Sequence, residues 1–215
     1  MEVFFIRHGQ STANVRHVHQ HPDTPLTDLG HEQAAAAAKR LRDFNPTRII
    51  SSPSTRAFDT ARAIGAELGL PVVTNQVFME LKRPKYVYGY SHFHPRSLWY
   101  IAQWFFKWRD PSWRDLGGES YEMFIDRIQE GREYLETFGQ HERIVVVSHS
   151  IFINFFVEHV CNERKLSLWE ALLRLTKIVV LDNTSITHVE YDHSDNPNLC
   201  TWNTLEFDDD GHVVK

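Results

Sequence analysis

The residues of this sequence that could do chemistry follow apolar runs. Arg7 and His8 come directly after the apolar residues 3–6. Arg56 and His149 each come shortly after a later apolar run. An arginine carries a permanent charge on a planar fork that suits phosphate or carboxylate. A histidine is the side chain most easily poised as an acid, a base or a nucleophile near neutral pH. These residue types suit a site for a dianionic group such as a phosphoryl group, provided that the fold brings them together.

The predicted elements place these residues at one edge of a sheet. The segments 3–6, 47–50 and 143–147, each of which ends in consecutive apolar residues, are predicted to be buried strands of a parallel sheet. Helices are predicted over 33–44 and 55–68, and this alternation of strand and helix indicates parallel strands with right-handed crossovers. The carboxyl ends of such strands lie at one edge, where ligands bind. We therefore predict an α/β fold with three layers (α/β/α) and a mostly parallel central sheet.

The remaining elements complete this arrangement. Strands are predicted at 71–73, 185–191 and 201–207, and helices at 98–108, 120–139 and 151–160, with a shorter helix opened by Ser167 and Glu170. Residues 11–23 are predicted to form a polar loop. Thr27 is expected to cap the helix that follows it, and Gly69 to end the helix before it. Turns are predicted at 110–112 and 192–198.

Length and composition limit the class of protein. The chain has 215 residues, of which 42% are hydrophobic and 24% are charged, as is typical of a globular protein. Its net charge of −5 argues against a general nucleic-acid binder, which would be basic. No apolar run is long enough to cross a bilayer, and Met1 opens almost directly into the first strand. A cytoplasmic protein with no membrane partner is therefore expected. Cys161 and Cys200 are expected to be reduced and structural.

The segment 82–117 interrupts the alternation of strands and helices. It contains four of the six tryptophans of the chain, which are Trp99, Trp104, Trp108 and Trp113. A membrane-surface helix, a homodimer interface and a lid are three interpretations of such a stretch. In the tryptophan-rich stretch only Arg96, Lys107 and Arg109 supply positive charge, which is little for an anionic membrane, and aromatic residues at helical spacing usually pack. Residues 1–215 are expected to form one domain, with 82–117 as a lid over the site, and a homodimer stays open.

Several short motifs occur in a fixed order along the chain. They are Arg7-His8-Gly9 with Asn14, Pro25-Leu26-Thr27 with Gly30, Ser51-Ser52-Pro53 with Arg56 and Thr60-Ala61, Gly118-Glu119-Ser120, and Val147-Ser148-His149. In this order they resemble the signature of the histidine phosphatase superfamily, which has the phosphoglycerate-mutase-like fold. Each motif is short, but a match by chance to all five motifs in the same order is very improbable. The resemblance extends from residue 2 to about residue 190.

The resemblance implies a role for each matching residue. His8 would be the nucleophile and would form a phosphohistidine intermediate. The phosphoryl group would be held by the residues around it, which are Arg7, Arg56, His149, Asn14 and Ser150. The arginines fit this role physically, because two guanidinium charges near the imidazole favour the neutral form that attack requires. The same charges stabilise a phosphoryl group in transfer.

The leaving oxygen needs an acid, whose conjugate base can then activate water. The family places a glutamate for this step just beyond the third strand, and Glu80 is the residue at that place. Glu119 is the alternative, although its position before Ser120 suits a loop-to-helix role better. Glu80 is therefore the expected acid.

The chain departs from the family pattern at two places. Ser150 stands where the family usually has glycine, a change that disturbs little but is expected to narrow the pocket. Residues 82–89 replace a Gly-x-x-Glu-Gly run that often follows the acid in the family. The second departure leaves the substrate class open but not the phosphoryl chemistry.

Two further groups of polar residues could either be ordinary surface residues or bind a ligand. The first group consists of loop histidines, which are His17, His19, His21, His92 and His94. A polar rim of the pocket is expected for them rather than a metal site, because neither a fixed ligand geometry nor a cysteine partner supports a metal. The second group consists of Lys82, Arg83 and Lys85, which would ordinarily form a solvated turn. Next to Glu80 they could also hold a second anionic group of the substrate.

Together these observations predict a metal-independent phosphomonoester hydrolase that needs no cofactor. Its partner would be a small phosphorylated metabolite. One alternative is a phosphomutase, in which the phosphohistidine returns its phosphoryl group to another hydroxyl. Gln10 favours the phosphatase, because mutases of the family tend to carry glutamate there. A second alternative is a module that binds a phosphorylated ligand without turnover.

Overall fold

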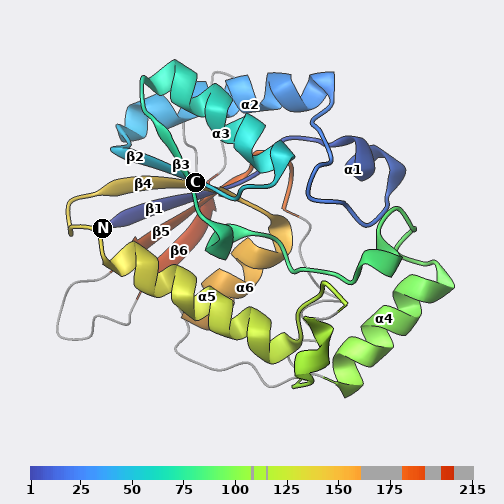
Figure 1. Cartoon of the computed structure of the whole chain (residues 1–215). Coiled ribbons are helices and arrows are strands. Elements are labelled where there is room, and N and C mark those ends of the chain that lie inside the picture. The colour runs from blue at the N-terminus through green and yellow to red at the C-terminus, as the bar shows by residue number, and fades with distance from the viewer. Residues whose placement is uncertain (108, 115, 161–180, 192–199, 206–215) are drawn as a thin grey trace.

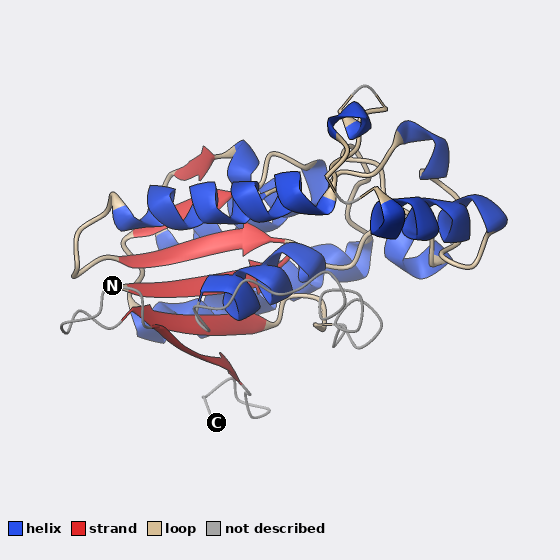
Figure 2. Cartoon of the chain, turned by 90° about the horizontal axis from the view of Figure 1, so that it is seen from below, coloured by secondary structure: helices blue, strands red, loops and turns tan. Residues whose placement is uncertain are grey.

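The computed structural model describes residues 1–107, 109–114, 116–160, 181–191 and 200–205, which form a sheet with helices on both faces (Figures 1 and 2). The strands are β1 (Glu2–Arg7), β2 (Arg48–Ser51), β3 (Val72–Thr74), β4 (Arg143–Ser148), β5 (Ile186–Tyr191) and β6 (Cys200–Leu205). The α-helices are α1 (Thr12–Arg16), α2 (Asp28–Leu41), α3 (Thr55–Leu68), α4 (Pro95–Phe106), α5 (Tyr121–Glu136) and α6 (Ser150–Val160). Short 3₁₀ helices cover Arg42–Phe44, Gln76–Phe78, Lys85–Val87 and Pro111–Trp113.

The sheet has the strand order β3-β2-β4-β1-β5-β6. The first four of these strands are parallel, whereas β5 and β6 are each antiparallel to their neighbour. The register pairs Arg7 at the end of β1 with Ser148 at the end of β4, and Ser51 at the end of β2 with Val147. The residues that follow these three strands therefore start from the same edge of the sheet. The prediction of a mostly parallel α/β sheet is confirmed.

The strand β1 is buried on both faces, as its continuous apolar sequence predicts. Val3 and Phe5 belong to the apolar cluster under α5 and α6, while Phe4 and Ile6 belong to the cluster under α2 and α3. None of the four side chains is exposed. Since burying a side chain of this size contributes about 1.5–3 kcal/mol, β1 joins the two helical layers that Figure 1 shows on opposite sides of the sheet.

The alanine run lies in α2, which packs on α3. Ala34, Ala37 and Ala38 are all fully buried, so the small side chains let α2 approach its neighbours closely. The helix begins five residues earlier than predicted and ends at Leu41, with a 3₁₀ turn after it. The early start has a local cause, because the Thr27 hydroxyl accepts the backbone N–H of Gly30 at 3.1 Å and opens the helix at once.

Local capping also explains where other predicted boundaries are wrong. The predicted polar loop 11–23 contains the short helix α1, which Ser11 opens in a capping box with Asn14. The helix predicted over 98–108 is α4, which starts earlier because His94 caps it through the backbone N–H of Arg96. The helix α5 ends at Glu136 and is capped by a threonine, not at the glycine of the sequence prediction.

The helix α3 and the strands β3, β4, β5 and β6 lie within a few residues of their predicted positions. Gly69 ends α3 with a φ of 69°, a left-handed conformation that suits glycine. A 3₁₀ turn, Pro111–Trp113, stands at the predicted turn 110–112. The helix opened by Ser167 and the turn 192–198 lie outside the described residues. Within the described residues, none of the helices is both long and apolar enough to cross a bilayer.

The segment 82–117 stands beyond the carboxyl ends of the parallel strands, with α4 as its main element (Figure 1). One side of the segment is core, because Tyr100, Trp104 and Trp113 are buried in the cluster under α5 and α6. The indole N–H of Trp104 donates to the Glu119 carbonyl at 3.1 Å, which ties α4 to the residue just after the segment. The tryptophan-rich stretch is thus anchored to the sheet domain by its buried aromatic side chains.

Candidate active site

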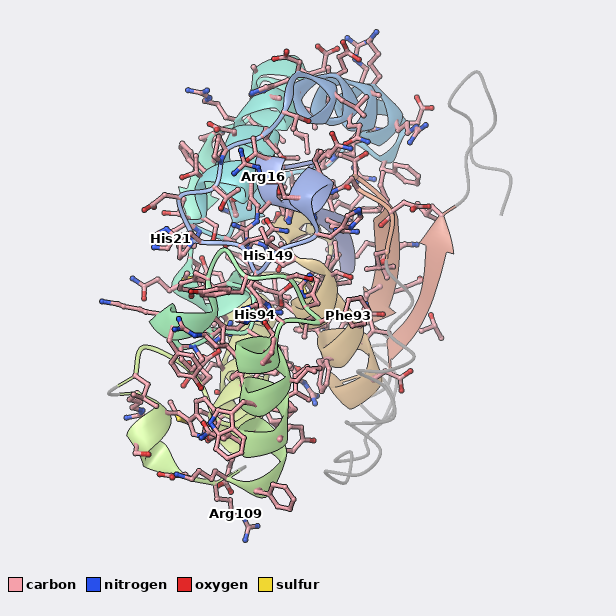
Figure 3. All side chains as sticks on the ribbon, turned by 90° about the vertical axis from the view of Figure 1, so that its right-hand side faces the viewer. Arg16, His21, Phe93, His94, Arg109 and His149 are labelled. Atoms are coloured by element: carbon pink, nitrogen blue, oxygen red, sulfur yellow. The ribbon has the colours of Figure 1, made fainter. Side chains whose placement is uncertain are left out.

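A cavity of about 260 Å³ lies at the carboxyl edge of the sheet. Figure 3 faces this edge and shows His149 between the segment that carries His21 and the start of α4 at His94. The residues that line the cavity come from the loops after β1, β2, β3 and β4 and from the segment 82–117. They are Arg7, His8, Ala13, Asn14, His17, Val18, His19, Gln20, Arg56, Glu80, Arg83, His92 and Ser150.

The imidazole of His8 is held in one tautomer. Its Nδ1 lies 2.7 Å from the carbonyl oxygen of Gly9, which can only accept a hydrogen bond. Nδ1 therefore carries the proton, and Nε2 keeps its lone pair. The Nε–H of Arg56 donates to that Nε2 at 3.1 Å. The main chain of His8 is fixed as well, because its N–H donates to the Ser148 carbonyl and its carbonyl accepts the side-chain amide of Asn183.

Two glycines bring the loop after β1 and the start of α2 into direct backbone contact. A Cβ atom on Gly9 would lie 2.4 Å from the carbonyl oxygen of Gly30, and a Cβ on Gly30 would lie 2.1 Å from that of Gln10. Neither position has room for a side chain. Because Gly9 has no side chain, α2 can pack directly against the backbone of the loop that carries His8, and this contact holds the loop in place.

The pKa of His8 lies well below its usual value. Burial is the largest cause, and the positive charges of Arg56 and Arg7 add to it. His8 is therefore neutral at physiological pH, which is the form in which an imidazole can attack. The pKa of His149 is lowered in the same way, by burial first and then by Arg56 and His8.

Arg56 connects the polar groups of the site from the first turn of α3. Besides its bond to His8, its Nη1 donates to the His21 carbonyl at 3.0 Å and its Nη2 to the Nδ1 of His149 at 3.2 Å. Burial lowers the pKa of Arg56 to about 10, so the guanidinium stays charged at neutral pH. One fixed charge thus faces both histidines.

His149 lies against His8 but does not line the cavity. The two ring centroids are 5.1 Å apart, and His149 is fully buried. Because Arg56 can only donate, the Nδ1 of His149 accepts, and its Nε2–H donates to the Ser52 hydroxyl at 2.8 Å. In this arrangement His149 orients Arg56, and a role in holding phosphoryl oxygens stays a prediction.

Three further predicted residues line the cavity with polar groups that a ligand can use. Arg7 donates to the Leu181 carbonyl through Nη1, while its Nε is buried and has no partner among the described residues. The Oδ1 of Asn14 accepts from the backbone and hydroxyl of Ser11, which leaves its amide NH₂ for a ligand. The hydroxyl of Ser150 is likewise buried and unpaired.

Glu80 is held at the amino terminus of α6. Its carboxylate accepts the backbone N–H groups of Ile151 and Phe152, each at 3.2 Å, and that of Leu81 at 2.9 Å. Exposed N–H groups at a helix start suit a carboxylate. Glu80 lines the same cavity as His8, so the structure brings the predicted nucleophile and the predicted acid into one pocket.

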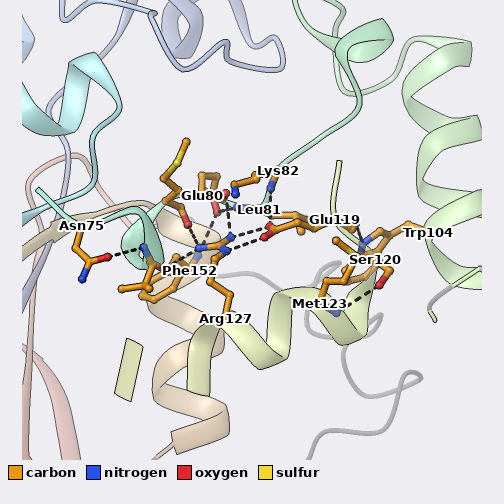
Figure 4. A network of polar contacts seen from close by, with 12 residues as sticks. Asn75, Glu80, Leu81, Lys82, Trp104, Glu119, Ser120, Met123, Arg127 and Phe152 are labelled. Atoms are coloured by element: carbon orange, nitrogen blue, oxygen red, sulfur yellow. Dashed lines mark hydrogen bonds and ion pairs between the residues drawn. The ribbon is translucent and has the colours of Figure 1, made fainter. Parts of the chain in front are cut away.

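The carboxylate of Glu119, the alternative acid, forms a buried ion pair with Arg127. Its two oxygens accept the Nε–H and an Nη2–H of Arg127, both at 2.7 Å, and the pair is almost fully buried (Figure 4). One oxygen also accepts the backbone N–H of Lys82 at 3.0 Å. Glu119 does not line the cavity that holds His8. Its contacts are those of a structural ion pair.

Arg127 is a positioning residue that the sequence analysis did not single out. Besides Glu119, it donates to the carbonyl oxygens of Val77, Met79 and Glu80, at 2.8, 2.7 and 3.3 Å (Figure 4). It therefore fixes the main chain from which the Glu80 side chain projects. The one sequence signal that could have pointed to Arg127 is its position, because it falls on the face of the predicted helix that is buried in α5. The sequence does not indicate which groups it would bind.

We expect the change Arg127→Met to destabilise the fold by about 3 kcal/mol, because it leaves the buried Glu119 carboxylate without its charge partner. Urea denaturation measures this loss. The matched control is Arg62→Met on α3, whose exposed side chain pairs with Asp59 at 3.3 Å and whose loss should cost less than about 1 kcal/mol. Equal losses for the two variants would contradict this account of Arg127.

The buried histidines predict a dependence of stability on pH. The folded-state pKa values of His8, His149 and His19 all lie below the ordinary value of 6.5. Below that pH the unfolded chain binds protons that the folded chain does not. The free energy of unfolding should therefore fall as pH decreases from about 6.5 to 5, by up to about 1.4 kcal/mol per pH unit for each histidine. Urea denaturation across this range measures it, and a flat profile would contradict the shifts.

The other predicted polar residues divide between the cavity and its surroundings. His17, His19 and His92 line the cavity, as does Arg83. His94 instead caps α4. The remaining two also lie elsewhere: His21 binds Arg56 only through its carbonyl, and Lys82 lines a separate hollow beside Arg127. No group of three or more potential metal ligands was found in the part of the chain that the structure describes.

Comparison with known proteins identifies the family. The model of the histidine phosphatase superfamily, branch 1, matches residues 3–211. The Escherichia coli O1:K1 protein named Probable phosphoglycerate mutase GpmB is 28% identical over 202 residues, which cover 90% of this chain and 86% of that protein. The chain belongs to the histidine phosphatase superfamily, as its motifs predicted.

Solved structures show the same fold. The α-ribazole phosphatase from Shigella flexneri superposes with a TM-score of 0.73 at 22% identity, covering 95% of this chain and 96% of that one. A mycobacterial glucosyl-3-phosphoglycerate phosphatase, solved with VO3, has a TM-score of 0.69 at 25% identity and covers 94% and 96%. The proteins that this chain resembles thus bear the names of a probable mutase and of phosphatases.

Proposed function

We propose that the protein is a phosphomonoester hydrolase that works through a phosphohistidine on His8. The observation that carries the proposal is the state of the His8 ring. Its Nδ1–H is bound to Gly9, and its neutral Nε2 faces the guanidinium of Arg56 in a cavity that Arg7 and Glu80 also line. A neutral nucleophile beside fixed positive charge suits attack on a phosphoryl group.

The proposed reaction has two steps. In the first, the Nε–H of Arg56 leaves the Nε2 of His8 and donates to a phosphoryl oxygen instead, which frees the Nε2 lone pair. This Nε2 attacks phosphorus, the phosphorus–oxygen bond to the leaving group breaks, and protonated Glu80 gives its proton to the leaving oxygen. In the second, Glu80 takes a proton from water, the water oxygen attacks phosphorus, and the nitrogen–phosphorus bond breaks. Arg7 and Arg56 stabilise the charge on the transferred group in both steps, with Asn14 at its edge.

The proposed substrate is a small phosphorylated metabolite. A cavity of about 260 Å³ suits a compact leaving group. Two related structures bear the names of phosphatases for small molecules, α-ribazole phosphatase and glucosyl-3-phosphoglycerate phosphatase. We also propose that residues 1–215 form one domain with 82–117 as the lid, because Arg83 and His92 from that segment line the cavity.

A phosphomutase is the second candidate, because the relatives at 28% identity are named Probable phosphoglycerate mutase. The two reactions share the phosphohistidine and differ in what accepts the phosphoryl group. Incubation with a phosphoglycerate and analysis of the products separates them. A phosphatase releases phosphate, whereas a mutase returns the phosphoryl group to another hydroxyl of the same acid.

The proposal is tested by phosphate release from p-nitrophenyl phosphate across about pH 5 to 8, with EDTA present. We expect turnover that EDTA does not reduce. Turnover that stops in EDTA and returns with an added divalent metal would overturn the metal-independent mechanism. Tight binding of phosphate without turnover of any phosphomonoester would instead support a binding module.

Lys82 and Arg83 are neighbours in the sequence, but their side chains line different hollows of the structure. Arg83 lines the cavity, whereas Lys82 points to the other hollow. For a phosphorylated hydroxy acid, whose leaving group is anionic, Arg83→Ala should raise KM by about 10-fold or more, as expected for a lost charged hydrogen bond. Lys82→Ala should leave KM unchanged and is the matched control. Steady-state kinetics measure both values, and equal effects would contradict a role for Arg83.

A further inference from the structure

His19 stands in the wall of the cavity with no partner for either ring nitrogen. The residue is only 5% exposed, and both Nδ1 and Nε2 are buried and unpaired among the described residues. Leaving a buried polar atom unpaired costs about 1–3 kcal/mol. Because His19 lines the same cavity as His8 and Glu80, a molecule bound there can supply the missing partners.

The main chain holds the His19 ring in this position. Val18 and Ser91 form an antiparallel bridge between the loop after α1 and the segment 82–117. Next to this bridge, the N–H of His19 donates to the Tyr90 carbonyl at 3.0 Å, and the His19 carbonyl accepts the N–H of Gly89 at 2.9 Å. The position of His19 is therefore set by two chain segments at once.

Neighbouring rings also restrict the orientation of His19. The ring of His92 meets it edge to face with centroids 4.4 Å apart. The ring of Tyr100 in α4 also meets the His19 ring edge to face, with centroids 6.4 Å apart, and the buried Tyr100 hydroxyl likewise has no partner among the described residues. Unpaired polar atoms thus gather where the lid segment meets the cavity.

The chemical state of His19 indicates which group it can bind. Burial lowers its pKa to about 3, with smaller contributions from Arg83 and His92, so the ring is neutral at physiological pH. A neutral imidazole offers one N–H donor and one acceptor nitrogen. Two hydroxyl groups of a polyol match this pair, since one can accept from the N–H and the other can donate to the acceptor nitrogen, whereas an alkyl chain leaves both nitrogens unpaired.

We propose that His19 is a specificity-determining residue that recognises a hydroxyl group of the leaving group. The preferred substrates are then phosphomonoesters of polyols, including sugars. This inference rests on the proposed phosphatase function, because it concerns the part of the substrate that is released. His19 acts on substrate choice, and the chemistry stays with His8 and Glu80.

The test compares polyol phosphates with alkyl phosphates of the same length. The matched pairs are glycerol 1-phosphate with propyl phosphate, erythritol 4-phosphate with butyl phosphate, and ribitol 5-phosphate with pentyl phosphate. For at least one pair, the wild type should favour the polyol ester in kcat/KM by about 100-fold or more, since sites built to bind a hydroxyl reject analogues without it. In His19→Phe this ratio should fall to within about tenfold of unity.

Two variants and one stability measurement make the test specific. His19→Gln keeps one donor and one acceptor and should retain part of the preference. His31→Phe makes the same replacement on the exposed face of α2 and should leave the ratio as in the wild type. The Tm of His19→Phe should equal or exceed that of the wild type, because the lost nitrogens have no partners in the fold.

The outcomes separate this inference from the proposed function. Hydrolysis of both members of every pair at similar rates by the wild type would overturn the role of His19 and leave the phosphatase intact. An unchanged preference in His19→Phe would do the same. Absence of hydrolysis for all six esters, with turnover of p-nitrophenyl phosphate, would overturn the role of His19 alone. Absence of turnover for p-nitrophenyl phosphate as well would overturn the phosphatase function itself, and the inference with it.

Discussion

The change His8→Ala is expected to lower kcat/KM for p-nitrophenyl phosphate by at least about 10⁴-fold. In the proposed mechanism His8 supplies the atom that forms the covalent bond to phosphorus. The neighbouring His149 cannot take this role, because it is fully buried and does not line the cavity. Measurement of phosphate release under saturating and limiting substrate gives kcat and kcat/KM.

The control for His8→Ala is the folded state of the variant. His8 is held mainly by its main chain, so the loss of the ring should leave secondary structure by circular dichroism unchanged. A correctly folded His8→Ala protein that keeps more than about 1% of wild-type activity would show that His8 is not the nucleophile.

The second large effect is expected for Glu80→Gln, which keeps the shape of the side chain and removes its proton-transfer function. General acid catalysis typically contributes about 10²–10⁴-fold, and its contribution grows as the leaving group becomes more basic. We therefore expect a large loss of kcat/KM for an alkyl phosphate and a smaller loss for p-nitrophenyl phosphate, whose leaving group needs little help. Rates for both substrates measure this difference.

Glu119→Gln is the matched comparison, because Glu119 is the other carboxylate considered for this step. It is paired with Arg127 and does not line the cavity, so its loss should lower stability without a dependence on the leaving group. A leaving-group dependence in Glu119→Gln and not in Glu80→Gln would reverse the two assignments.

The central features of the fold could be predicted because two independent signals in the sequence agree, namely the apolar pattern of the strands and the family motifs. Residues 3–6 of β1 are apolar without interruption, and both faces of the strand are covered. Arg7 and His8 end that strand, and parallel strands share one edge, so their convergence with Arg56 followed from topology alone. The family motifs then added roles that topology cannot assign.

The parts that the sequence did not predict depend on side chains that act through unrelated segments. Arg127 looks like any buried polar residue of a helix until its bonds to Val77, Met79 and Glu80 are seen. His19 belonged to a group of loop histidines expected only to form a polar rim. The sequence could not show that its ring nitrogens are buried and unpaired, because their burial depends on the contact between Val18 and Ser91, which are far apart in the chain.

The central claim is that His8 carries the phosphoryl group, and trapping the covalent intermediate tests it most directly. The protein is mixed with p-nitrophenyl phosphate, quenched in alkaline denaturant, and its peptides are analysed by mass spectrometry. We predict an acid-labile phosphoryl group on the peptide that contains His8, with more of it in Glu80→Gln, where water is no longer activated. Continued turnover with no phosphoryl group on His8, or with the group on another residue, would contradict the account.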